Sequence, residues 1–287
     1  MRLRLISPLL IAALIILPGC SRPRPSPARP ALFVVRDADT IIWLFGTIHA
    51  LPSNVTWETP AIRHAIDGAD MLVTEILPPD PAVIGAQFTA LAHRNGLPTI
   101  AARTPARLRA ALERAIADAG ETASALDAQE SWAVALALEN GRARAAGADP
   151  ANGVERILAR RFAGRPQRAL ETAGSQLALF DGLSARDQRR LLVLAITDHD
   201  GYARTLAAWS AGNVAAMARS NDRLFVGAPA MHAALLTDRN IRWSRWITRR
   251  MRSPGKVLVA VGAGHLAGRE SVVAMLRRAG LSVRRVQ

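Results

Sequence analysis

The sequence is short of the residue types that mark several classes of protein. Cys20 is its only cysteine, so no disulfide can form within the chain. Tyr202 is its only tyrosine, and aromatic residues make up 5% of the 287 positions, too few for a surface that stacks nucleic-acid bases. Lys256 is the only lysine among 37 basic residues, and the arginines are scattered along the chain. The formal net charge of +14 therefore does not indicate a nucleic-acid-binding protein.

The N-terminus has the pattern of a signal peptide. Half of all residues are hydrophobic, yet the apolar run at residues 5–17 is shorter than the roughly 20 residues of a membrane-spanning helix. Ser7 and Pro8 interrupt this run, and Arg2 and Arg4 precede it. A basic start followed by a short apolar run predicts that residues 1–19 are a signal peptide.

The apolar run ends at Leu17-Pro18-Gly19-Cys20, which resembles a bacterial lipobox. In that pattern the cysteine sulfur is acylated, for example with palmitate, and cleavage leaves Cys20 as the first residue. We therefore expect a lipoprotein in the bacterial cell envelope that faces the periplasm, with the outer membrane favoured. The alternative is an ordinary secretory signal with an incidental cysteine.

Residues 21–30 contain four prolines and three arginines. Such a segment prefers the extended polyproline conformation, and we expect it not to pack. The predicted organisation is a lipidated tether at residues 20–30 followed by a single domain at residues 31–287.

Short apolar segments predict strands near both ends of the chain. Residues 32–36 and 40–45 form a predicted hairpin, and residues 71–76, 256–261 and 281–286 are further strands. Between residues 81 and 251 the pattern is helical almost throughout. The predicted fold is α/β (α+β), with a mixed central sheet formed by N- and C-terminal strands and a long helical insertion between them.

Three of these strands lead into side chains that suit chemistry. His49 follows Gly46, His265 follows Gly262, and Glu75 ends the strand at residues 71–76. Ligands bind beyond the carboxyl ends of strands in open α/β sheets. Two imidazoles and a carboxylate are a common set of ligands for a divalent metal. For each histidine alone the alternative is an ordinary polar turn, and for Glu75 it is a solvated strand end. The matching G-x-x-H spacing favours a shared site.

The glycines at 262, 264 and 268 also resemble a dinucleotide-binding loop. That loop requires a following βαβ unit with an acidic residue about 20 positions on. The chain has Arg284 and Arg285 in the next strand and stops at Gln287, so the context excludes this interpretation.

Six short motifs follow one another along the chain: Gly46-Thr47-Ile48-His49, Ala69-Asp70 leading to Glu75, Gly153-Val154-Glu155, Leu170-Glu171-Thr172 with Gln176, Arg239-Asn240 before Trp243, and Val261 through Gly268. In this order they resemble the motifs of the TraB/GumN family, relatives of the Tiki metalloproteases. The matches cover the chain from about residue 32 onward, and it is their order that makes them specific.

The resemblance implies a metal-dependent hydrolase, peptidase-like by analogy with the Tiki branch, that uses a divalent cation such as Mn²⁺, Co²⁺ or Zn²⁺. By position in the motifs, His49, Glu75 and His265 would bind the metal or activate water. The implied partners are the membrane, through lipidated Cys20, and a peptide or other envelope substrate, with no nucleic acid.

The same resemblance places four further residues around the site. Glu155 and Glu171 would be additional acids, and the alternative for each is a solvated helix face or cap. Arg239 and Asn240 would orient substrate or a carboxylate ligand, and the alternative for Asn240 is a helix C-terminal cap.

Two other functions remain open from the sequence. One is a non-catalytic envelope lipoprotein that binds a polysaccharide or a protein. The other is an envelope protein that binds haem or another tetrapyrrole.

Overall fold

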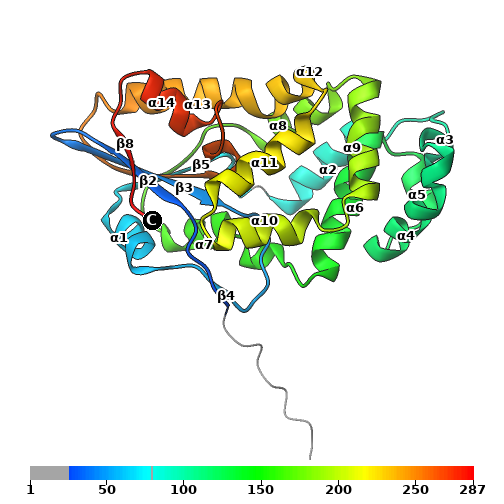
Figure 1. The fold of residues 1–287 in the computed structure, drawn as a ribbon, viewed down its shortest axis with the longest axis horizontal. Helices are drawn as coiled ribbons and strands as arrows, with labels where there is room; N and C mark the ends of the chain where they lie inside the picture. The colour runs from blue at the N-terminus through cyan, green and yellow to red at the C-terminus, as the bar shows by residue number, and fades with distance from the viewer. Residues whose placement is uncertain (1–25, 79) are drawn as a thin grey trace, which may run out of the picture.

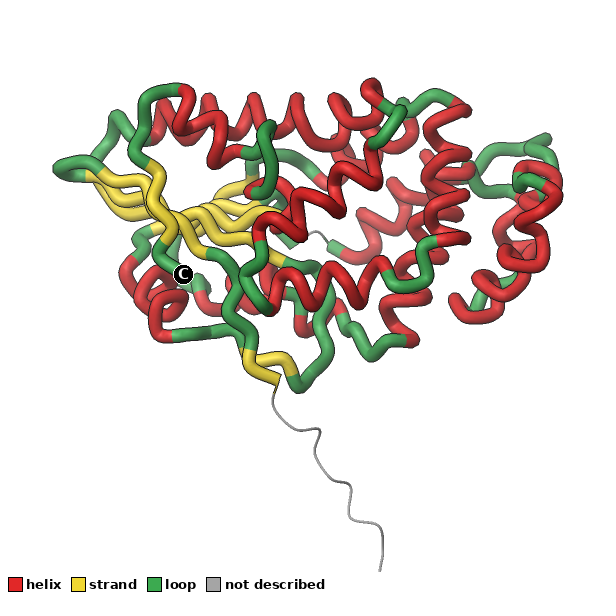
Figure 2. The backbone as a smooth tube through the Cα atoms, viewed as in Figure 1, coloured by secondary structure: helices red, strands yellow, loops and turns green. Residues whose placement is uncertain are grey.

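The computed structural model describes residues 26–78 and 80–287. Figure 1 shows a twisted sheet with helices on both faces and further helices beyond one end of the sheet. Figure 2 shows the strands gathered in one half of the molecule. Cys20 and the predicted signal peptide lie outside the described residues. Within the described ranges, no helix is long and apolar enough to span a membrane.

The main sheet has six strands in the order β6-β5-β7-β3-β2-β8. Strands β6, β5, β7 and β3 are parallel, whereas β2 pairs antiparallel with β3 and β8. A separate pair joins β1 to β4. The strand bounds are β1 Ser26–Pro27, β2 Leu32–Arg36, β3 Thr40–Thr47, β4 Val55–Thr56, β5 Met71–Thr74, β6 Gln167–Ala169, β7 Gly255–Gly262 and β8 Val283–Arg285.

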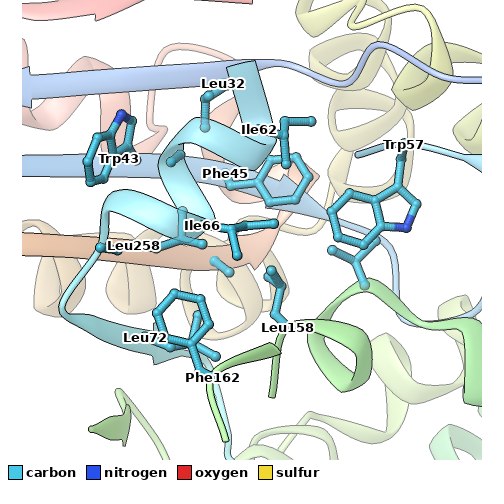
Figure 3. Packing of buried hydrophobic residues seen from close by; sticks show 14 of the residues in the cluster. Leu32, Trp43, Phe45, Trp57, Ile62, Ile66, Leu72, Leu158, Phe162 and Leu258 are labelled. Carbon is cyan, nitrogen blue, oxygen red and sulfur yellow. The ribbon is translucent and has the colours of Figure 1, made fainter. Parts of the chain in front are cut away.

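Alternating apolar side chains explain why the sheet is covered on both faces. Along β3, Trp43 and Phe45 pack on one side, and Ile42 and Leu44 pack on the other. The first side forms a core with α1, α7 and α10, part of which is drawn in Figure 3. The second side packs against α13 and α14. These five helices span α1 Pro60–Gly68, α7 Val154–Arg161, α10 Gly201–Ser210, α13 Asp238–Arg250 and α14 Val272–Arg278.

The remaining helices lie mostly past the carboxyl ends of the parallel strands (Figure 1). Helices α4, α6 and α9 share a separate apolar core there. The bounds are α2 Pro81–Ala92, α3 Ile100–Arg103, α4 Arg109–Ala119, α5 Ala123–Asp127, α6 Ser131–Ala145, α8 Ala173–Asp181, α9 Ala185–Thr197, α11 Val214–Phe225 and α12 Pro229–His232. Short turns of 3₁₀ helix occur at η1 Ala106–Leu108, η2 Pro150–Asn152 and η4 Ala263–Leu266, and η3 Ala233–Thr237 is a π-helix.

The structure confirms the predicted α/β class and the mixed sheet, and it corrects the expectation of an all-helical middle. Strand β6 lies between α7 and α8 in the chain and pairs with β5 at the edge of the sheet. Its three residues, Gln167–Ala169, include no β-branched or aromatic side chain, so the sequence carries no strand pattern there. Pairing with β5 makes this segment extended.

The end of the proline-rich segment is also packed, contrary to the expectation for residues 26–30. The amide of Ser26 donates to the carbonyl of Asn54 at 2.8 Å, and the amide of Ala28 donates to Thr56 at 2.7 Å. Ala28 is buried in the core on the α1 side of the sheet. The extended conformation that prolines favour is what allows this pairing with β4.

Candidate functional site

The four parallel strands end at the same edge of the sheet, and each leads into one of the acidic or histidine residues predicted from the sequence. In order across the sheet, β6 leads to Glu171, β5 to Glu75, β7 to His265 and β3 to His49. The edge strand β6, which the sequence did not predict, is therefore what brings Glu171 to the site. Backbone pairing continues past the strand ends, since the amide of Glu171 donates to the carbonyl of Glu75 at 2.8 Å.

Two of the motif glycines lie in close packing at this edge. The amide of Gly262 donates to Oε1 of Glu75 at 2.6 Å, and a Cβ atom at Gly262 would lie only 3.1 Å from the same oxygen. Gly153 precedes α7, and a Cβ atom there would lie 2.1 Å from the carbonyl oxygen of His49. Only glycine fits at position 153, where the close neighbour is backbone, whereas a Cβ atom at position 262 would displace the Glu75 carboxylate slightly.

The guanidinium of Arg239 is the centre of a buried network. Its Nη2 donates to Oε2 of Glu75 at 2.6 Å and lies 3.0 Å from Oε2 of Glu171. Its Nε donates to Glu171, and its Nη1 contacts Nε2 of His265 at 3.1 Å and the carbonyl of Leu235 at 3.3 Å. Four of its five N–H groups therefore take part in hydrogen bonds, and Nη2 also forms an ion pair with Glu171.

The helix that carries Arg239 has an unusual start. The π-helix Ala233–Thr237 directly precedes α13, and Leu235 within it supplies the carbonyl that Arg239 contacts. A π-helical turn shifts the following side chains around the helix, and such turns often occur at functional sites. Arg239 and Asn240 are both buried, and Asn240, at 0% exposure near the start of α13, is not a C-terminal cap.

The neighbours of Glu171 complete the network. Gln176 donates from Nε2 to Glu75 at 3.0 Å and to Glu171 at 3.2 Å. The indole of Trp243 donates to Glu171 at 3.1 Å, and Arg242 contacts the same carboxylate at 3.3 Å. Glu171 is thus an ion-paired side chain with 7% exposure, and it does not lie on a solvated helix face.

Asn240 defines the tautomer of His265. The amide nitrogen of Asn240 donates to the carbonyl of Glu270 at 2.7 Å, so its Oδ1 faces Nδ1 of His265, also at 2.7 Å. Because Oδ1 is an acceptor, Nδ1 carries the proton and Nε2 has a free electron pair that accepts from Arg239. The ring of Trp243 packs against the imidazole with centroids 4.4 Å apart.

The pKa values of the buried pair keep the carboxylate charged and the imidazole neutral. Burial alone raises the pKa of Glu75, but the charges of His265 and Arg239 and the amide of Gly262 outweigh it and lower the pKa to about 2. Burial lowers the pKa of His265 to about 4, against the opposing charge of Glu75. At neutral pH the site therefore holds an ionised Glu75 beside a neutral His265.

His49 and Glu155 form a second pair at the other side of the edge. Nδ1 of His49 lies 2.8 Å from Oε1 of Glu155, whose other donor is the hydroxyl of Thr47. The Glu155 side chain is 15% exposed, whereas that of His49 is 74% exposed. The carboxylate of Glu155 raises the pKa of His49 to about 9, and the more distant charge of Glu75 adds to this effect. Among the described residues, no hydrogen bond or ion pair joins His49 to Glu75 or His265.

The helical middle of the chain contacts these strand ends. Tyr202 donates to the carbonyl of Ala50 at 3.1 Å, and the indole of Trp209 donates to Gly46 at 2.8 Å. On the other side, Asn221 of α11 donates to the carbonyl of Gly264 at 2.8 Å. Both G-x-x-H loops are therefore held by helices α10 and α11.

The residues predicted to bind a metal do not fit one as they are arranged. The 3.9 Å from Nε2 of His265 to Oε1 of Glu75 is within the roughly 3–4 Å that two ligands of one ion allow, so this distance is not the obstacle. The Arg239 guanidinium donates to both groups and occupies the position a cation would take. No group of three histidine, cysteine, aspartate or glutamate side chains suited to a metal ion occurs within residues 26–78 and 80–287.

The sequence assigned no role to three residues of this network. Arg242 and Trp243 lie three and four positions after Arg239, a spacing that places side chains on one face of a helix. That spacing was the available signal. Gln176 stood in a motif without a role, and only the packing of α8 shows that it bridges Glu75 and Glu171.

Of the comparisons with known proteins, the one with protein families supports the resemblance seen in the sequence. Neither the curated proteins nor the solved structures gave a match. The model of the TraB/PrgY/gumN family matches residues 31–285, which include every residue of both contact networks. The chain therefore belongs to the TraB/PrgY/gumN family.

Proposed function

We propose that this protein is a hydrolase of acyl bonds whose site is the strand-end edge, with His49 as the general base. The observation that carries the proposal is the His49–Glu155 pair. One nitrogen of an exposed imidazole is held by a mostly buried carboxylate, and the other, Nε2, is left for a substrate or a water molecule. A base oriented in this way by a third group is the arrangement that hydrolytic catalysis requires.

The proposed reaction has two proton transfers at Nε2. Neutral His49 takes a proton from water as the water oxygen bonds to the carbonyl carbon of the substrate. The protonated ring then gives this proton to the leaving nitrogen or oxygen as its bond to the carbonyl carbon breaks. Glu155 holds Nδ1 throughout and stabilises the charged ring. General acid–base catalysis of this kind typically contributes about 10²–10⁴-fold in rate.

The proposed reaction does not pass through the metal that the family resemblance implies, because Arg239 fills the position between His265 and Glu75. A peptide is the first substrate class to test, since peptidase activity is what the Tiki branch suggests. Location is a further part of the proposal: the signal-peptide pattern and Cys20 support a lipid-anchored protein of the cell envelope.

The test is hydrolysis of a peptide and ester library, followed by mass spectrometry, with purified wild type and His49→Ala. We expect products from the wild type and a loss of about 10²-fold or more in His49→Ala. His93→Ala is the matched control, because His93 is an exposed histidine at the end of α2, outside both contact networks. Equal rates for wild type and a folded His49→Ala would reject the hydrolase and leave a binding protein as the better explanation.

A further inference from the structure

Arg239 contacts three groups that, in another protein, would be expected to hold a divalent cation. The carboxylates of Glu75 and Glu171 and the imidazole Nε2 of His265 all face its guanidinium, at 2.6, 3.0 and 3.1 Å. Two carboxylates and one imidazole are a frequent set of metal ligands. Here the cation they surround is a side chain of the protein.

In the part of the chain that the structure describes, no other cationic side chain contacts all three groups. The side chains of Glu75 and Glu171 are each 7% exposed, so water does little to stabilise their charges. Arg242 also contacts Glu171, but it is 54% exposed and no contact joins it to Glu75 or His265 in the described residues. Gln176 bridges the two carboxylates without carrying charge. Within residues 26–78 and 80–287, Arg239 is therefore the only cationic side chain that contacts both carboxylates.

The guanidinium is also held too completely to be an incidental neighbour. Four of its N–H groups take part in hydrogen bonds, Nη2 also pairs with Glu171, and its Cζ lies over the ring of Trp243, 4.7 Å from the ring centroid. Removing one partner of a buried ion pair leaves an uncompensated charge, which is strongly unfavourable. Loss of Arg239 would leave two such charges beside a free nitrogen electron pair.

From this geometry we propose that Arg239 is the resident cation of the site, in the place of a divalent metal, and that removing its side chain converts Glu75, Glu171 and His265 into a cation-binding site. The wild-type chain binds no divalent metal at these residues. The inference concerns the site of the proposed hydrolase, but it rests on contacts alone. Its test uses no enzymatic activity, so the two proposals fail independently.

The experiment measures Co²⁺ binding to the full chain, by calorimetry and by the visible absorption of protein-bound Co²⁺. We expect no saturable site in the wild type. Arg239→Ala should bind one Co²⁺ per chain. Its dissociation constant should be at least about tenfold lower than that of any weak Co²⁺ binding measured for the wild type. The double variant Arg239→Ala, His265→Ala should lose the Co²⁺ absorption.

The matched control is Arg242→Ala, which removes an arginine from the same carboxylate without emptying the position between Glu75 and His265. It should bind no Co²⁺. Methylguanidinium, which resembles the missing side-chain end, should raise the melting temperature of Arg239→Ala and compete with Co²⁺. It should leave Arg242→Ala unchanged.

Three results would overturn the inference. One is stoichiometric Co²⁺ in the wild type that His265→Ala removes. Another is a folded Arg239→Ala that neither Co²⁺ nor methylguanidinium stabilises more than Arg242→Ala. If Arg239→Ala does not fold, the wild type and Arg239→Lys decide the matter: both should fold without metal, and a metal requirement for folding of either would reject the proposal.

Discussion

Glu155 lies 2.8 Å from His49, and this contact ties the end of β3 to the first turn of α7. The pair is asymmetric, because the carboxylate is mostly buried and the imidazole is mostly exposed. Burial alone raises the pKa of Glu155, but the contacts with His49 and Thr47 outweigh it and lower the pKa. Glu155 therefore stays ionised and holds a proton on His49 at neutral pH.

This pair predicts that the rising limb of the pH profile of hydrolysis has its midpoint at alkaline pH. His49 acts as a base only when neutral, so kcat/KM should rise with pH up to about 9, the pKa of His49. Glu155→Gln removes the charge that raises this pKa, and the limb should move toward the ordinary value of 6.5. Added salt should also lower the pH at the midpoint of this limb, because ions screen the exposed ring from the charge of Glu155. A profile measured from pH 5 to pH 10 checks this.

The control for that experiment is Glu113→Gln, which removes an exposed carboxylate from α4. Its limb should coincide with that of the wild type. A limb in Glu155→Gln that stays at the wild-type position would show that His49 is not the titrating base.

A second prediction concerns stability in acid. Burial lowers the pKa of His265 from 6.5 to about 4, so the folded state takes up this proton less readily than the unfolded state. Stability is then complete above pH 6.5 and falls as the pH decreases toward 4. The shift corresponds to a loss of about 3 kcal/mol over that window.

Urea unfolding at pH 7 and pH 4.5 measures this effect. His265→Gln should be less stable than the wild type at pH 7, because the ring contacts are lost, but its stability should depend less on pH. His93→Gln removes an exposed imidazole and should behave like the wild type. An equally steep decline in His265→Gln would assign the acid sensitivity to other groups.

The sequence predicts much of the fold because the buried strands carry their own pattern. β7 is apolar on both faces, and Val257 and Leu258 lie in different cores on its two sides. β6 has no such pattern, so only its place beside β5 makes it a strand. Sequence reasoning finds a strand through its side chains, and a strand made by backbone pairing at an edge escapes it.

The site shows the same division. Glycine spacing and strand ends place His49, Glu75 and His265 at one edge of the sheet, and the structure has them there. The contacts among them depend on the position of α13 over the sheet. Long-range packing determines this position, and no local sequence pattern indicates it. That position puts Arg239 between Glu75 and His265, where the sequence predicted a metal.

A third prediction tests the lipid anchor. Wild type expressed in bacteria should incorporate a labelled fatty acid and sediment with membranes, since two or three acyl chains anchor a protein firmly. Cys20→Ser should lose the label. Label that persists on Cys20→Ser, or that is absent from the wild type, would contradict lipidation.

A fourth prediction concerns Gly153, the residue that lets α7 approach the end of β3. A Cβ atom at this position would lie 2.1 Å from the carbonyl oxygen of His49, so Gly153→Ala must push the two segments apart. We expect a loss of about 1–3 kcal/mol of stability, typical of overpacking. The midpoint of the rising limb of hydrolysis should lie at a lower pH than in the wild type, because His49 moves away from Glu155.

Gly85→Ala is the matched control. Gly85 lies inside α2 with open space around its Cβ position, and alanine there should stabilise the helix by up to about 1 kcal/mol. If close packing is what selects glycine at position 153, the melting temperature should fall in Gly153→Ala and rise in Gly85→Ala. A change of the same sign in both variants would refute that cause.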